Sequence, residues 1–275
     1  RLIKLKKFKN FIFFKKDVLN INKFDKKLKN IDTIFHLAAQ AGVRDSQKEP
    51  LNYHLNNVSA TYELIKFINN QNINNIFFSS SSSVYGDSTS FNESIITNPL
   101  SFYASTKQYN ESMFKYFLKN KRVICMRFFS VFGEEGRPDM AVYKFIKSID
   151  LKKKIYLNNK GNDKRDYTYI KDLLEIIYLS YLKMIEKKPF FKALNYGLGK
   201  SYSTRELFNT IRNNMSKNFN KVVYSDKNIY DVDLTKSDYS NLLDFLEIKS
   251  IKYLKTTKLD TAIKHTIDWY KNNKN

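Results

Sequence analysis

Short apolar runs that end in small or polar residues recur along this chain, with amphipathic segments between them. The run at residues 76–78 continues into five serines, and the run at residues 34–37 continues into Ala38, Ala39 and Gln40. Small side chains at a strand end let a ligand approach the backbone closely, and the carboxyl ends of parallel strands face the ligand crevice. The alternation therefore predicts an α/β fold with a doubly wound parallel sheet.

Apolar spacing and turn residues predict the remaining elements. The expected strands are residues 10–14, 32–37, 76–78, 122–129, 154–157 and 193–197. The expected helices are residues 24–29, 50–70, 103–120, 141–149, 173–187 and 257–270, with a further helix opening at Ser203. Ser203 and Glu206 have the spacing of a capping box, and Ser101 is a suitable N-cap after Asn98-Pro99.

Tyr103 and Lys107 stand four residues apart near the start of one expected helix. On a helix this spacing places both side chains on one face, one turn apart. An ammonium beside a phenol favours the phenolate, so we expect the pKa of Tyr103 to fall below about 10. The pair is then a candidate acid/base site, with a strand-end serine able to bond the same substrate oxygen. The alternative is a partly exposed helix face without chemistry.

Composition limits the class of protein. The 275 residues suit one large domain or two small ones, and a single cysteine, Cys125, excludes an internal disulfide. No apolar run is long enough to span a membrane, so we expect a cytoplasmic protein without membrane contact. The net charge of +21 comes from scattered lysines without an aromatic-interleaved basic stripe, so no nucleic-acid partner is expected. Three histidines without paired spacing predict no metal site.

Two further polar residues have open interpretations. His36 lies within an apolar run and fits a hydrogen-bonded core histidine better than a catalytic one. Asp17 follows an expected strand, where it could meet the adenine of a cofactor or remain an exposed loop carboxylate.

Six motifs in order resemble the NAD-dependent epimerase/dehydratase branch of the extended short-chain dehydrogenases/reductases, and among them the UDP-glucuronate 4-epimerases. The motifs are residues 36–44, 79–86, 103–107, 127–133, 137–140 and 165–170. The resemblance implies a Rossmann-like domain, a smaller α/β substrate domain, and NAD as cofactor.

The resemblance also implies roles for individual residues. Tyr103 would be the catalytic base and acid, Lys107 would bind the nicotinamide ribose, and Ser81 would bond the sugar 4-hydroxyl. Arg165 would neutralise the UDP pyrophosphate, and Arg137 would face a sugar carboxylate. The remaining implied contacts are those to NAD, from Asp17, Leu37, Ala38, Ala39, Gln40, Asn57 and Ser79, and a substrate contact from Ser130.

The implied reaction is oxidation of a UDP-sugar at C4, rotation of the 4-keto sugar, and return of hydride to its other face. The resemblance favours UDP-glucuronate to UDP-galacturonate, as in polysaccharide biosynthesis. Serines at 82 and 83, where dehydratases need an acidic residue, favour simple epimerisation. The alternatives are UDP-N-acetylglucosamine or UDP-glucose as substrate, a catalytically inactive fragment, and a basic nucleic-acid binder. A homodimer through helices 50–70 and 103–120 would follow from the resemblance.

The chain departs from this family at its start. The sequence has seven glycines, the first at Gly42, and no Gly-x-x-Gly-x-x-Gly turn. We therefore expect an N-terminally truncated member that lacks the first βαβ unit. Expected boundaries are residues 1–135 for the NAD-binding domain, with a return around 166–197, and 136–275 for most of the substrate domain. The segment 230–238 matches the family only in part.

Overall fold

The computed structural model describes residues 2–23, 28, 30–215, 219, 221–227, 229, 231–254 and 256–273. The helix expected at residues 24–29 lies outside these residues except for Leu28. Among the residues described, no helix is long and apolar enough to cross a membrane.

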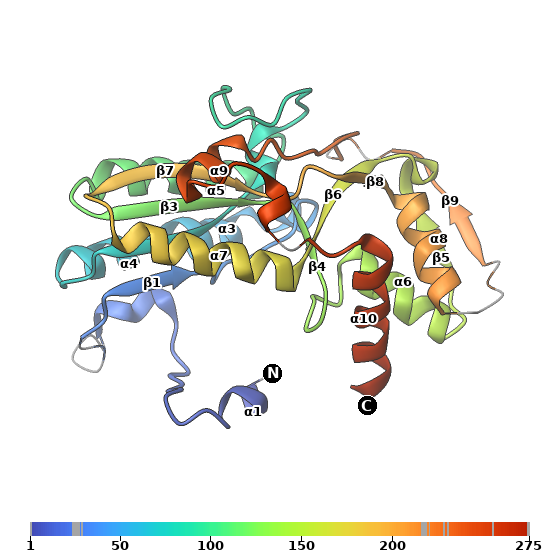
Figure 1. Ribbon diagram of the computed structural model, residues 1–275, viewed down its shortest axis with the longest axis horizontal. Helices are drawn as coiled ribbons and strands as arrows, with labels where there is room; N and C mark the ends of the chain where they lie inside the picture. The colour runs from blue at the N-terminus through green and yellow to red at the C-terminus, as the bar shows by residue number, and fades with distance from the viewer. Residues whose placement is uncertain are drawn as a thin grey trace.

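A four-stranded parallel sheet forms the centre of the larger part of the molecule (Figure 1). Its order is β1 (Thr33–His36), β2 (Asn75–Ser81), β3 (Arg122–Phe128) and β7 (Phe190–Tyr196). Every neighbouring pair is parallel, so the four carboxyl ends lie on one edge. The expected α/β class with a parallel sheet is confirmed.

Helices cover both faces of this sheet because its strands are apolar on both sides. Phe78 and Cys125 pack with α4 (Ala60–Asn69) and α5 (Phe102–Phe117). Phe77 and Ile124, one residue earlier in each strand, pack with α7 and α9 on the opposite face. Those two helices are α7 (Ile170–Ile185) and α9 (Ser240–Leu246).

The smaller part lies to the right in Figure 1 and has its own core. Its helices are α6 (Ala141–Asp150), α8 (Thr204–Asn214) and α10 (Leu259–Asn272). The capping box of Ser203 and Glu206 opens α8 as expected. Its strands are β4 (Ser130–Phe132), β6 (Lys164–Tyr169) and β8 (Ser201–Ser203) in one sheet, and β5 (Ile155–Leu157) and β9 (Val222–Tyr224) in another.

The strand expected at residues 10–14 is wrong. The segment has no regular structure, and Ile12, Phe13 and Phe14 are exposed. No strand of the described chain lies beside it to accept its backbone hydrogen bonds, so its apolar pattern alone does not make a strand. A short helix, α1 (Leu2–Leu5), precedes it, and a 3₁₀ segment, η1 (Val18–Lys23), follows.

The helix expected at residues 50–70 forms, but in three continuous pieces. These are α3 (Pro50–Tyr53), a π-helical segment η3 (His54–Ser59) and α4. A π segment turns side chains away from the ordinary helical register and is frequent at functional sites. Here it contains Asn57, whose side chain reaches the loop after β1. The remaining short helices are α2 (Asp45–Lys48), η4 (Ser82–Tyr85), η5 (Asn158–Gly161) and η6 (Ile251–Tyr253).

Candidate active site

The serine run forms the carboxyl end of β2 and the turn after it. Ser79 and Ser81 are two residues apart on this strand, and because side chains alternate along a strand, both lie on the same side of the sheet. Ser81 is buried, and its hydroxyl accepts the N–H of Ser83 at 3.1 Å as the N-cap of η4. The cap fixes the serine at the edge where the sheet ends.

Helix α5 brings Tyr103 and Lys107 to the same strand end. Ser101 caps the helix as expected, accepting the N–H of Ala104 at 3.2 Å. The Lys107 ammonium is buried and donates to the Ser79 carbonyl at 2.7 Å. It also lies 5.8 Å from the centre of the Tyr103 ring. The predicted triad of Ser81, Tyr103 and Lys107 therefore converges on the end of β2.

The expected lowering of the Tyr103 pKa is wrong for this structure. Burial raises the pKa of the phenol above its ordinary value, and a hydrogen bond from Ser81 and the charge of Arg137 oppose that rise only in part. Burial also lowers the pKa of Lys107 to about 7, so this side chain gives up its proton more readily than an exposed lysine does. For the Tyr103 phenol, desolvation thus outweighs the two influences that lower its pKa, those of Ser81 and Arg137.

Asn57, in the π-helical segment, holds the loop that follows β1. Its side-chain oxygen accepts the N–H of Gln40 at 2.7 Å, and its amide donates to the Gln40 carbonyl at 3.0 Å. The same amide donates to Thr106 of α5 at 3.0 Å. Ala38 and Ala39 just before Gln40 are exposed. The loop of small residues after β1 is therefore fixed at Gln40 and open to a ligand at Ala38 and Ala39. Leu37, the first residue of this loop, is also exposed.

His36 and Asp17 have structural partners. The buried His36 ring nitrogen Nε2 lies 3.1 Å from the Thr61 hydroxyl, and burial lowers the pKa of His36 to about 3. This supports the core interpretation. The exposed Asp17 carboxylate accepts the N–H of Leu19 at 2.9 Å and so caps η1.

Both predicted substrate arginines are ion-paired with nearby aspartates. Arg137 donates to Asp139 from Nε at 3.0 Å and from Nη2 at 2.5 Å, and to the Ala41 carbonyl at 3.4 Å. The last contact places Arg137 at the loop after β1, and its charge reaches Tyr103. Arg165, at the start of β6, lies 3.8 Å from Asp163. Ser130 is half-buried at the start of β4.

Sequence reasoning missed two sets of residues around the triad. Tyr53 is fully buried, and its ring meets the Tyr103 ring edge-on at 6.4 Å. Glu111, one helical turn after Lys107, forms a buried ion pair with Arg127 of β3 at 2.7 Å. Residues 103, 107 and 111 are each four apart on α5, and this spacing could have indicated that Glu111 lies on the same helix face as the tyrosine and the lysine.

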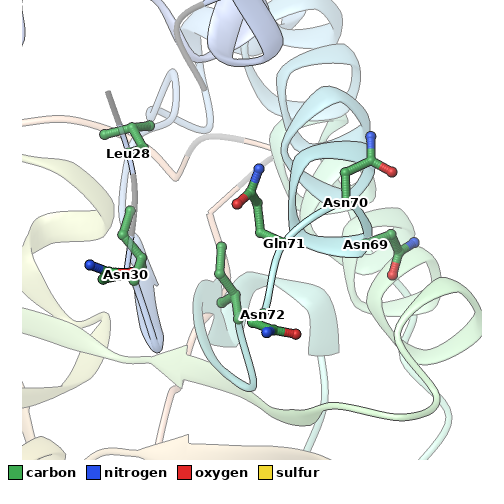
Figure 2. Close-up of a pocket in the computed structure, with 8 residues that line it drawn as sticks. Leu28, Asn30, Asn69, Asn70, Gln71 and Asn72 are labelled. Atoms are coloured by element: carbon green, nitrogen blue, oxygen red, sulfur yellow. The ribbon is translucent and has the colours of Figure 1, made fainter. Parts of the chain in front are cut away.

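A hollow of the surface lies away from this site (Figure 2). It measures about 490 Å³, and amide side chains, among them Asn30 and Gln71, line it. These residues precede β1 and β2, so the hollow is at the amino edge of the sheet, opposite the triad. We assign it no catalytic role. Among the described residues, no group of three or more His, Cys, Asp or Glu side chains could hold a metal ion.

Comparison with known proteins agrees with this fold. Residues 2–195 match the model of the NAD dependent epimerase/dehydratase family. The chain belongs to this family, and this membership makes it an enzyme of the epimerase type.

Several similar proteins are UDP-sugar 4-epimerases. A UDP-glucuronate 4-epimerase of Thermodesulfobacterium geofontis is 31% identical over 99% of this chain and 83% of its own length. The UDP-glucuronic acid 4-epimerase of Bacillus cereus, solved with UDP-glucuronic acid and NAD, has a TM-score of 0.88 at 27% identity, covering 98% of this chain and 85% of that one. A UDP-N-acetylglucosamine 4-epimerase of Methanobrevibacter ruminantium, solved with UDP-N-acetylmuramic acid, has a TM-score of 0.85 at 29% identity, covering 96% and 84%.

Proposed function

We propose that this protein is an NAD-dependent UDP-sugar 4-epimerase, and that its substrate is UDP-glucuronate, converted to UDP-galacturonate. The observation that carries the proposal is the convergence of Ser81, Tyr103 and Lys107 on the carboxyl end of β2, in a chain similar to UDP-glucuronate 4-epimerases along nearly its whole length.

The residues at the ends of β1 and β2 fit the nicotinamide half of NAD. Ala38 and Ala39 expose the backbone that Asn57 fixes through Gln40, which suits close approach by a flat ring. Lys107 would hold the nicotinamide ribose. The sequence has no glycine-rich turn for the pyrophosphate, so that half of the cofactor is not accounted for by these residues.

The chemistry that NAD supplies when bound is reversible oxidation at C4 of the sugar. Tyr103 removes the proton of the 4-hydroxyl and later returns a proton to the 4-keto oxygen. Ser81 bonds the same oxygen and keeps it within reach of the phenol. The two influences that lower the pKa of Tyr103 come from Ser81 and Arg137, both proposed to face the sugar. Rotation of the 4-keto sugar before reduction inverts C4.

Arg137 supports the choice of an acidic sugar. Its guanidinium already holds a carboxylate, that of Asp139, in a two-point contact. A glucuronate carboxylate has the same shape and charge and could take the same two donors. UDP-N-acetylglucosamine or UDP-glucose is the alternative, since one similar structure is a UDP-N-acetylglucosamine 4-epimerase.

We also retain two organisational proposals. One is the division into an NAD-binding part, residues 1–135 with a return around 166–197, and a substrate part from residue 136. The other is a homodimer through α3–α4 and α5. The exposed apolar side chains on these helices support it, namely Leu51, Leu55, Tyr62, Tyr109, Tyr116 and Phe117.

The test is incubation of the protein with NAD and UDP-glucuronate, followed by anion-exchange separation of the sugar nucleotides. We expect UDP-galacturonate to approach a constant ratio without added NADH, and Tyr103→Phe to abolish the conversion. Conversion of a neutral UDP-sugar alone would refute the glucuronate assignment and keep the triad. Failure with every UDP-sugar would favour the inactive fragment.

A further inference from the structure

A third arginine lies at the ligand edge of the molecule. Arg44 donates from Nη2 to Oδ2 of Asp231 at 2.5 Å. Arg137 and Arg165 are paired with aspartates two residues away in the sequence, but Asp231 is 187 residues from Arg44. The Arg44–Asp231 ion pair therefore joins two distant parts of the chain, whereas the ion pairs of Arg137 and Arg165 are local.

Arg44 ends the loop that leaves β1 beside the catalytic tyrosine. Two residues earlier, Gly42 has φ of +134°, and a side-chain carbon there would lie 3.0 Å from the Tyr53 hydroxyl. Tyr53 in turn contacts the Tyr103 ring. Arg137 also holds this loop through the Ala41 carbonyl. The loop therefore forms one wall of the site, and Arg44 is at its end.

Asp231 brings Arg44 toward the start of β6. The segment that follows Asp231 runs beside Lys164, which donates its N–H to the Asp233 carbonyl at 2.8 Å. Lys164 also accepts the N–H of Thr235 at 3.0 Å and forms a bridge with Leu234. Arg165, the residue proposed to face the pyrophosphate, is next along β6. Arg44 and Arg165 thus approach the same segment from the two parts of the molecule.

The Arg44–Asp231 pair is easily exchanged. The Arg44 side chain is 47% exposed and that of Asp231 19%. Exposed pairs of this kind change an equilibrium by about fivefold at most. A diphosphate carries more negative charge than one carboxylate and offers oxygens that match both donors of a guanidinium. A diphosphate that reaches this edge would therefore displace Asp231 from Arg44.

We propose that Arg44 is a second binding residue for the diphosphate of the nucleotide sugar, opposite Arg165, and that Asp231 occupies Arg44 until the diphosphate replaces it. The inference rests on the proposed function and adds a residue to its binding site. It assigns Asp231 the role of competing with the diphosphate for Arg44, not of contacting substrate.

Calorimetric binding of UDP and of uridine tests the inference without turnover. We expect Arg44→Ala to weaken UDP binding about tenfold or more, the effect of losing a charged hydrogen bond, and to leave uridine binding unchanged. Arg44→Lys should restore part of the affinity. Asp231→Asn should tighten UDP binding by up to about fivefold. Asp233→Asn is the matched control, because Asp233 pairs with Lys227 at 2.8 Å and should leave UDP binding unchanged.

Circular dichroism of each variant shows that it is folded. Unchanged UDP affinity in folded Arg44→Ala, with the wild-type protein binding UDP, would overturn the inference and leave the epimerase proposal standing. Weaker UDP binding by the Asp231→Asn variant would overturn the proposal that the diphosphate displaces Asp231 from Arg44. A wild-type protein that neither binds UDP nor converts any UDP-sugar would overturn both proposals.

Discussion

Replacing Arg127 with methionine should be among the most destabilising single changes in this protein. The Arg127 guanidinium donates to Glu111 from Nε at 3.0 Å and from Nη2 at 2.7 Å, and to the Tyr85 hydroxyl at 3.0 Å. Both side chains of the pair are nearly buried, 6% and 9% exposed. The variant leaves the Glu111 carboxylate inside the protein without its cation, which costs about 3–5 kcal/mol. That is a large share of the roughly 5–15 kcal/mol that holds a domain folded.

Urea unfolding followed by circular dichroism measures this loss. Lys183→Met is the matched control, because the Lys183–Glu247 pair is as short, 2.6 Å, but lies at the surface with Glu247 59% exposed. The control should cost about 1 kcal/mol or less. The double variant Arg127→Met with Glu111→Leu should recover part of the loss, since no unpaired charge remains. Equal small losses in Arg127→Met and Lys183→Met would refute the reasoning.

Three other predictions concern the pH dependence, the strand clamp and a helix cap. Lys107 loses its proton near pH 7 when folded but near 10.5 when unfolded, so the unfolded chain binds more protons in between. The free energy of unfolding should therefore rise with pH in that window by up to about 1.4 kcal/mol per pH unit. Urea unfolding at pH 7–9 measures this slope, and the same slope in the Lys107→Met variant would contradict the prediction. Asn57→Ala frees Gln40 and should weaken NAD binding about tenfold by calorimetry; unchanged affinity would show that the clamp is not needed. Ser203→Ala removes the capping box of α8 and should cost about 1 kcal/mol, and no change in thermal midpoint would count against it.

The sequence predicted the elements whose causes are local. Ser101 and Ser203 announce helix starts because a cap needs only a side chain and an amide three residues on. The buried strands 75–81 and 122–128 were predictable because each is apolar on both faces and the chain then reaches serine, at once in the first strand and at Ser130 after the second. The convergence of Ser81, Tyr103 and Lys107 was predictable because a strand end and a helix start, each recognisable alone, carry these residues.

What the sequence did not predict depends on distant partners. Residues 10–14 have the composition of a strand but no neighbouring strand among the described residues. The three-residue strands β8 and β9 form because β6 and β5 lie beside them. The raised pKa of Tyr103 needs the burial of its phenol, which no spacing reveals. The Arg44–Asp231 pair joins residues 187 apart, so neither one indicated the other.

The site owes its geometry to three successive turns of α5. Tyr103 meets Ser81, Lys107 bonds the Ser79 carbonyl, and Glu111 accepts the Ser80 hydroxyl at 2.5 Å. Each turn of the helix thus holds one residue of the serine strand end. Because helix and strand are both rigid elements, the distance between phenol and serine is set before any ligand arrives. The buried Glu111–Arg127 pair lies behind this contact, so its loss should also disturb the position of Ser81 relative to Tyr103. In a folded Arg127→Met protein, turnover should therefore fall more than substrate affinity.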